Sequence, residues 1–168
     1  MYNDIFNEND MQKLQELLRA NKQTITTAES CTGGLVASMI TKIAGSSDIF
    51  NGSIVTYSNK IKNQELKVKN ETLENFGAVS CEVVNEMLDG VINKFEADYA
   101  IAISGIAGPT GETKNKPVGT VVIGISGTEG HKKVDIHYFK GSREEVQIQA
   151  AKYSLKEILK FLQNTLDK

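Results

Sequence analysis

A serine and a cysteine stand side by side where an extended segment of the chain gives way to a helical one. Residues 26–34 read T-T-A-E-S-C-T-G-G, so Ser30 and Cys31 are followed by two glycines and an apolar run. Hydroxyl and thiol groups are nucleophiles of acyl transfer. A helix N-terminus adds unpaired backbone N–H groups and the positive end of the helix dipole, which stabilise an oxyanion. The segment therefore predicts an enzyme with its nucleophile at a helix N-terminus.

Ser30 is the preferred nucleophile of the two, although each residue has a structural alternative. A serine before a helix is usually an N-cap, and a free cysteine is usually a small buried apolar side chain. A helix N-terminus would lower the pKa of the Cys31 thiol and make it reactive. Cysteine hydrolases usually also need an imidazole, and the histidines, His131 and His137, come late in the sequence. These features together favour Ser30.

A serine nucleophile needs a base, and Lys62 is the candidate. It lies in a short polar segment, 59–69, that we predict to be helical. Burial in a pocket lowers the pKa of a lysine amine towards neutrality, so that the amine can accept a proton. The alternative is a solvated helix face, which applies equally to Lys60 and Lys67. Tyr57 either relays a proton to this pair or packs at a sheet edge.

Several further residues are candidates for holding a substrate. Two glycines after the nucleophile either admit a ligand to the backbone or allow close helix packing. The sequence S-G-I-A-G-P-T-G at 104–111 follows an apolar strand, and it matches neither the dinucleotide-binding nor the Walker template. An arginine near the last helix could clamp a phosphate or form a surface ion pair. The predicted binding and oxyanion positions are Cys31, Thr32, Gly33, Gly34, Ser104, Gly105 and Arg143.

Composition excludes several classes of function. The 168 residues fit one domain, 1–168, with a formal net charge of −2 and 7% aromatic residues. Such a chain offers neither a basic face nor stacked rings to nucleic acid. No apolar run approaches the roughly 18 residues of a membrane span, and no leader is visible, so we expect a cytoplasmic protein. The cysteines and histidines show no metal-type spacing, and we expect no metal and no cofactor.

Helical and extended patterns alternate along the chain. Residues 99–104 are almost continuously apolar, as in a strand that is covered on both faces. A hairpin-like link at 127–130 implies antiparallel pairing and hence a mixed sheet. The pattern predicts an α/β fold, a three-layer α/β/α sandwich with a mixed β-sheet. Predicted helices are 11–18, 35–43, 59–69, 81–95 with Ser80 as N-cap, and 143–166; predicted strands are 23–28, 53–57, 99–104, 119–126 and 132–139.

Four ordered motifs together resemble one known family. They are T-T-A-E-S-C-T-G-G, V-T-Y-S-N-x-x-K at 55–62, F-G-A-V-S at 76–80, and S-G-I-A-G-P-x-G with K-P-V-G-T-V at 104–121. The chain closely resembles the C-terminal domain of the competence/damage-inducible protein CinA, a family that includes stand-alone nicotinamide-nucleotide amidases. The resemblance covers nearly the whole chain.

The resemblance implies an α/β/α sandwich, a homodimer, and hydrolysis of nicotinamide mononucleotide to nicotinate mononucleotide and ammonia without a cofactor. It makes Ser30 the nucleophile, Lys62 the general base and Tyr57 their hydrogen-bonding partner. The family usually has threonine where this chain has Ser104. The nucleotide-processing domain of longer CinA proteins is not expected, so its pyrophosphatase activity is not implied. Alternatives are a nucleotide-binding module with weak or no turnover, and an interaction module in competence or the DNA-damage response.

Overall fold

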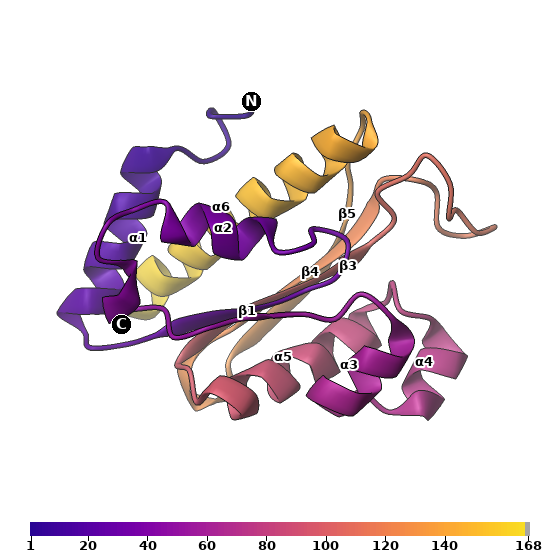
Figure 1. The fold of residues 1–168 in the computed structure, drawn as a ribbon, viewed down its shortest axis with the longest axis horizontal. Coiled ribbons are helices and arrows are strands. Elements are labelled where there is room, and N and C mark those ends of the chain that lie inside the picture. The colour runs from indigo at the N-terminus through magenta and orange to yellow at the C-terminus, as the bar shows by residue number, and fades with distance from the viewer. Residues whose placement is uncertain (167–168) are drawn as a thin grey trace.

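A five-stranded mixed β-sheet carries the fold (Figure 1). The computed structural model describes residues 1–166. The strand order is β2-β1-β3-β4-β5, in which β1 runs parallel to β2 and β3, whereas β4 runs antiparallel to β3 and β5. This arrangement confirms the predicted mixed sheet. The strands are β1 (Ile25–Glu29), β2 (Ile54–Val55), β3 (Tyr99–Gly105), β4 (Thr120–Ser126) and β5 (Lys132–Tyr138).

Helices cover both faces of the sheet and complete three layers (Figure 1). One face carries α1 (Glu8–Ala20), α2 (Leu35–Thr41) and α6 (Arg143–Leu166). The other face carries α3 (Asn59–Leu66), α4 (Asn70–Phe76) and α5 (Cys81–Phe95). The predicted α/β/α sandwich is therefore confirmed. None of the helices within residues 1–166 has the length and apolar character needed to cross a bilayer.

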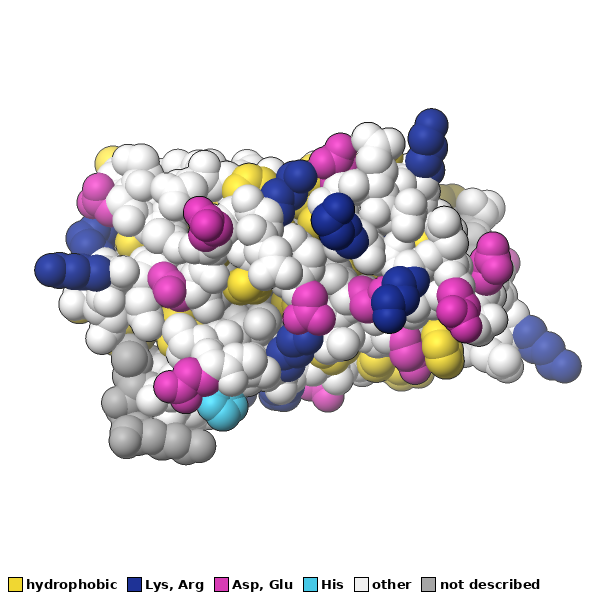
Figure 2. Space-filling model, turned by 90° about the horizontal axis from the view of Figure 1, so that it is seen from below, with side chains coloured by type: hydrophobic (Ala, Val, Ile, Leu, Met, Phe, Trp, Pro, Cys, Tyr) yellow, Lys and Arg dark blue, Asp and Glu magenta, His cyan; other side chains and the backbone are white. Residues whose placement is uncertain are grey.

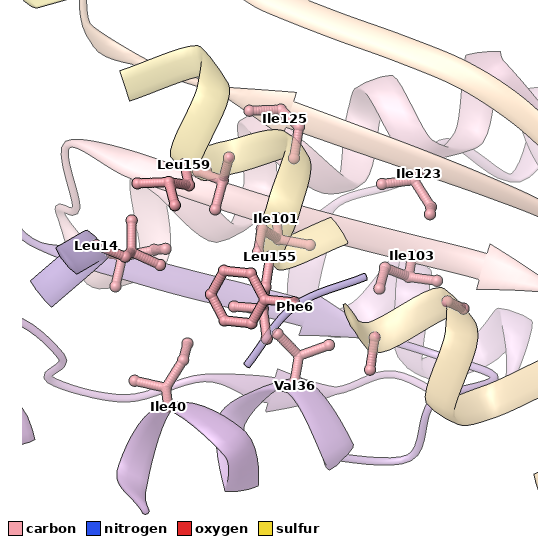
Figure 3. Packing of buried hydrophobic residues seen from close by; sticks show 14 of the residues in the cluster. Phe6, Leu14, Val36, Ile40, Ile101, Ile103, Ile123, Ile125, Leu155 and Leu159 are labelled. Atoms are coloured by element: carbon pink, nitrogen blue, oxygen red, sulfur yellow. The ribbon is translucent and has the colours of Figure 1, made fainter. Parts of the chain in front are cut away.

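The sheet separates two hydrophobic cores, because successive side chains of a strand point to opposite faces. Ile101 and Ile103 of β3 pack with α1, α2 and α6, as Figure 3 shows. Ala100 and Ala102 of the same strand face α5. Gly124 on β4 lets α5 approach closely, since a Cβ there would lie 2.7 Å from the side chain of Val84. The two cores also anchor the segments on either side of Ser30 and Lys62, since Cys31 and Val36 belong to the first and Leu66 to the second.

Charged side chains are interspersed on the face covered by α3, α4 and α5. Figure 2 shows the described residues from this side, with Lys and Arg scattered among Asp and Glu. The expectation that the protein does not bind nucleic acid stays a prediction.

Local differences from the sequence prediction occur near the site. Strand β2 is only two residues long, whereas 53–57 was predicted, and α3 ends at Leu66 rather than 69 because Lys67 adopts a left-handed backbone. Helix α4 was not predicted, since only Leu73 among its seven residues is buried and no periodicity marks it. The predicted N-cap at Ser80 is confirmed, because its Oγ accepts the Val83 N–H at 3.2 Å.

Candidate active site

Ser30 directly follows β1 and is not the N-cap of a helix. Its N–H donates to the Ile103 carbonyl of β3 at 3.0 Å, so the residue continues the pairing of β1 with β3 beyond the end of the strand. Helix α2 begins only at Leu35, and the expectation that Ser30 lies at a helix N-terminus is wrong. The intervening turn contains Gly33 (φ +60°) and Gly34 (φ +100°), both in left-handed conformations that other residues rarely adopt. The glycine pair is therefore explained by the turn.

The N-terminus of α2 is capped by the side chain of Glu29. The N–H groups of Val36 and Ala37 donate to this carboxylate at 2.9 and 3.0 Å. The carboxylate is fully buried and lies where the helix dipole is positive, which stabilises its charge. The positive end of α2 therefore faces Glu29 and is not free to stabilise a reaction intermediate. This role of Glu29 was not predicted from the sequence.

Lys62 reaches Ser30 from the face of the sheet that carries α3, opposite to the face that carries α2. It lies in the first turns of α3, which Ser58 caps through its side chain. Its side chain is 1% exposed. The amine Nζ lies 3.0 Å from Ser30 Oγ. The same nitrogen donates to the backbone carbonyls of Thr56 and Tyr57 at 2.9 and 3.3 Å. Three oxygen atoms thus surround one buried amine.

These three oxygen atoms can bind the Lys62 amine in either protonation state. Burial lowers the pKa of Lys62 from 10.5 to about 8. A neutral amine has two N–H groups and one lone pair, and the two carbonyl oxygens can only accept. They take both N–H groups, which leaves the lone pair to accept the Ser30 O–H. A protonated amine can donate to all three oxygens, so the site accommodates Lys62 in both protonation states.

The side chains of Tyr57 and Arg143 lie at the mouth of the site. Tyr57 is 61% exposed, and its hydroxyl accepts a hydrogen bond from Arg143 Nη2 at 2.8 Å. Arg143 Nη1 donates to the Gly108 carbonyl at 2.7 Å. Tyr57 therefore touches the Lys62 amine through its backbone carbonyl, while its hydroxyl is directed to Arg143. The guanidinium links the segment before α3 to the loop after β3.

The thiol of Cys31 is buried, and its surroundings disfavour the reactive thiolate. Burial raises the pKa of its thiol to about 12, and the charge of Glu29 adds to this effect. Of the two alternatives for Cys31, the small buried side chain therefore fits the structure, and the thiol activated by a helix N-terminus does not. The Cys31 carbonyl accepts a hydrogen bond from Gln147 Nε2 at 2.9 Å. Gln147 was not predicted from the sequence, although its place one helical turn after Arg143 indicates that both side chains lie on the same face of α6.

A pocket of about 350 Å³ brings most of the predicted site residues together. Those that line it are Ser30, Cys31, Tyr57, Lys62, Ser104, Gly105 and Arg143. Small and apolar residues not predicted for the site complete the lining: Ala78, Val79, Ile106, Ala107, Thr110 and Gly111.

The remaining predicted positions, Thr32, Gly33 and Gly34, do not line this pocket. Thr32 is buried, and its hydroxyl donates to Glu29 at 2.7 Å. Gly33 and Gly34 form the turn and are not part of the described pocket lining. A larger hollow of about 410 Å³ lies near Lys42 and Lys152, but it contains no nucleophile beside a base. Residues 1–166 also hold no cluster of three or more histidine, cysteine or acidic side chains suited to a metal.

The lowered pKa of Lys62 predicts a pH-dependent stability. In the unfolded chain the amine keeps its ordinary pKa of 10.5, so between pH 8 and 10.5 the unfolded state binds more protons than the folded state. The stability of the wild type should therefore rise with pH in this window. We expect its free energy of unfolding, relative to that of Lys62→Met, to increase by about 2 kcal/mol from pH 7.5 to pH 10. Urea denaturation of both proteins measures this; parallel pH dependences would contradict it.

A family model described as the CinA C-terminal domain matches residues 7–162. The chain belongs to the CinA C-terminal domain family. The resemblance of the four sequence motifs to this family is thus confirmed.

Curated relatives and a solved structure are similar to nearly the whole chain. The chain is 49% identical over 148 residues to the nicotinamide-nucleotide amidohydrolase PncC of Enterobacter agglomerans, covering 88% of this chain and 90% of the relative. The PncC of Escherichia coli K12 is 48% identical over 155 residues, covering 92% and 94%. The crystal structure of a CinA superfamily protein from Escherichia coli superposes with a TM-score of 0.90 at 32% identity, over 96% of this chain and 93% of that one.

Proposed function

We propose that this chain hydrolyses the carboxamide of nicotinamide mononucleotide to nicotinate mononucleotide and ammonia, through an acyl-enzyme on Ser30. The observation that carries the proposal is the buried Lys62 amine 3.0 Å from Ser30 Oγ in a pocket. Two relatives named nicotinamide-nucleotide amidohydrolase support the amide class of substrate. The homodimer and the cytoplasmic location stay predictions.

The first half of the reaction is acyl transfer. The neutral Lys62 amine accepts the hydroxyl proton while Ser30 Oγ bonds to the carboxamide carbon, and the carbonyl electron pair moves to oxygen. The resulting ammonium donates to Ser30 and to two backbone carbonyls. It then gives its proton to the amide nitrogen, the C–N bond breaks, and ammonia leaves. A neutral amine is thereby restored beside the ester.

Water completes the reaction by the reverse proton path. Lys62 takes a proton from the water that attacks the ester carbon, and returns it to Ser30 Oγ when the C–O bond breaks. The products are a free serine and a nicotinate nucleotide. The same base thus serves both halves.

Groups in the pocket lining stabilise the oxyanion in this mechanism. The N–H of Ser30 is already bonded to the Ile103 carbonyl, and the N-terminus of α2 is capped by Glu29. We assign the role to the Cys31 N–H, next in the chain, and to the Ser104 hydroxyl across the pocket.

The remaining lining residues suit the other parts of a nucleotide. Ala78, Val79 and Ile106 offer an apolar wall to the pyridine ring. Arg143 bonds only to neutral groups, and none of the ion pairs within residues 1–166 includes it. We assign it the phosphate, which a guanidinium binds in a bidentate manner.

Ammonia release from nicotinamide mononucleotide and from nicotinamide riboside, which lacks the phosphate, tests both assignments. We expect Arg143→Met to raise KM for the mononucleotide by about 10- to 100-fold, and KM for the riboside by less than about 3-fold, since only the former loses a charge-assisted contact. Arg19→Met is the matched control, because Arg19 pairs with Asp48 on the surface.

Two outcomes would contradict these assignments separately. Tight binding of the mononucleotide by the wild type without ammonia release would reject the amidase and favour a nucleotide-binding module. Equal losses on both substrates in Arg143→Met would reject the phosphate role alone.

A further inference from the structure

Glu29 is a buried charge that the proposed mechanism does not use. It precedes the nucleophile at the end of β1 and is 0% exposed. None of the ion pairs within residues 1–166 includes it. Burying a carboxylate costs free energy unless hydrogen bonds compensate the lost hydration. The Glu29 carboxylate beside Ser30 therefore needs hydrogen bonds that compensate this cost.

Four donors from three successive segments converge on this carboxylate. Oε1 accepts the Thr32 hydroxyl at 2.7 Å and the Val36 N–H at 2.9 Å. Oε2 accepts the Ala37 N–H at 3.0 Å and the Thr27 hydroxyl at 3.2 Å. The donors belong to β1, to the turn that follows Ser30, and to the first turn of α2. One carboxylate thus ties the strand, the turn and the helix together.

The turn has few other restraints of its own. Gly33 has open space where a side chain would be, and Gly34 meets only the side chain of Val55 at 3.5 Å. Within the turn, the Gly33 N–H donates to the Ser30 carbonyl, and the Leu35 N–H donates to the Thr32 carbonyl. From outside, Gln147 holds the Cys31 carbonyl. Two glycines leave the backbone conformationally free, so the bonds of the carboxylate add a fixation of the turn between β1 and α2 that the glycines do not provide.

We propose that Glu29 is a positioning residue, whose carboxylate fixes the turn after β1 so that Ser30 Oγ stays in contact with Lys62 Nζ. The proposal rests on the proposed function, since it gives Ser30 the role of nucleophile. Displacement of a reacting group by about 1 Å can lower a rate by about 10²-fold. Both oxygens must be acceptors, because each faces two donors. An amide in place of the carboxylate therefore sets an N–H₂ group against N–H or O–H donors.

Glu29→Gln tests this role with little change in shape. We expect kcat to fall by about 10²-fold, while KM changes by less than about 3-fold. The pH at which activity rises should stay the same, because backbone carbonyls of Thr56 and Tyr57 hold the Lys62 amine independently. Thr27→Val is the matched control: it removes the longest of the four bonds and leaves the turn tied to α2, so kcat should stay within about 3-fold.

A second pair of variants serves if Glu29→Gln fails to fold. Thr32→Val removes only the bond between the turn and the carboxylate, and we expect kcat to fall by about 10-fold. Thr32→Ser keeps the hydroxyl and should restore kcat to within about 3-fold of the wild type. A loss caused only by lower stability would leave the kcat of the folded protein unchanged in both variants and would overturn the proposal.

The rate at which iodoacetamide labels Cys31, in a Cys81→Ser background, measures how well the turn is fixed, and it requires no substrate. We expect Glu29→Gln to be labelled at least about 10-fold faster than the wild type, since the turn opens and the charge that disfavours the thiolate is gone. Faster labelling in a chain whose wild type releases no ammonia would support the fixation of the turn and reject the proposed function. Unchanged labelling with unchanged kcat, in a wild type that releases ammonia, would overturn the role of Glu29 alone.

Discussion

Ser30→Ala should lower kcat for ammonia release by about 10⁴-fold or more, because the acyl-enzyme can no longer form. The variant keeps the backbone N–H that donates to Ile103, so the end of β1 should fold as before. KM should change little, since the assigned phosphate and ring contacts lie elsewhere in the pocket. Steady-state release of ammonia from nicotinamide mononucleotide, with thermal unfolding as a check of folding, measures the effect.

Cys31→Ala is the matched control for the nucleophile. The two residues are adjacent and both buried, but the pKa of the Cys31 thiol is raised to about 12. A thiol that stays protonated is a poor nucleophile. We therefore expect kcat of Cys31→Ala to stay within about 5-fold of the wild type. An inactive Cys31→Ala beside an active Ser30→Ala would transfer the nucleophilic role to the cysteine.

Lys62→Met should lower kcat/KM by about 10³- to 10⁴-fold, because it removes the only base placed on the Ser30 hydroxyl within the described residues. Methionine has a similar length and no proton to exchange. Lys60→Met, on the same helix and exposed, is the control and should change kcat/KM by less than about 2-fold.

The pH dependence of the wild type gives a second measure of the same base. In the proposed mechanism the neutral amine is the active form, and burial lowers the pKa of Lys62 to about 8. Activity should therefore rise as pH increases through about 8, and fall about tenfold for each unit below it. This rising limb should be absent from the residual activity of Lys62→Met. A profile that is flat from pH 6 to pH 9 in the wild type would remove Lys62 from the role of base.

Most elements of the sandwich were predictable because their burial is periodic. Helix α5 repeats apolar residues towards one face, and Ser80 supplies a local cap. The apolar run at 99–104 predicts β3, which is buried from Tyr99 to Ser104. Such signals lie within one element. Helix α4 has a single buried residue, and it could not be found in this way.

The site was only partly predictable, since its contacts cross between elements. Ser30 and Lys62 lie 32 positions apart, and their 3.0 Å contact depends on β1 and β2 pairing in parallel. Residue types and motif resemblance predicted the pair, but spacing could not. The cap of α2 could not be predicted from the sequence, because Glu29 accepts from Val36, seven positions ahead, across a turn that two left-handed glycines make possible.

The amine of Lys62 is held by main-chain oxygens, and this has a genetic consequence. Replacing the side chains at positions 56 and 57 leaves both carbonyl groups in place. Point mutations there should therefore leave the hydrogen bonds of the Lys62 amine unchanged. Variants at position 56 that still fold should keep the pH profile of the wild-type activity. Insertion or deletion of a residue between β2 and α3 would instead shift both oxygens at once. Variation in this segment should accordingly be substitutional, at constant length.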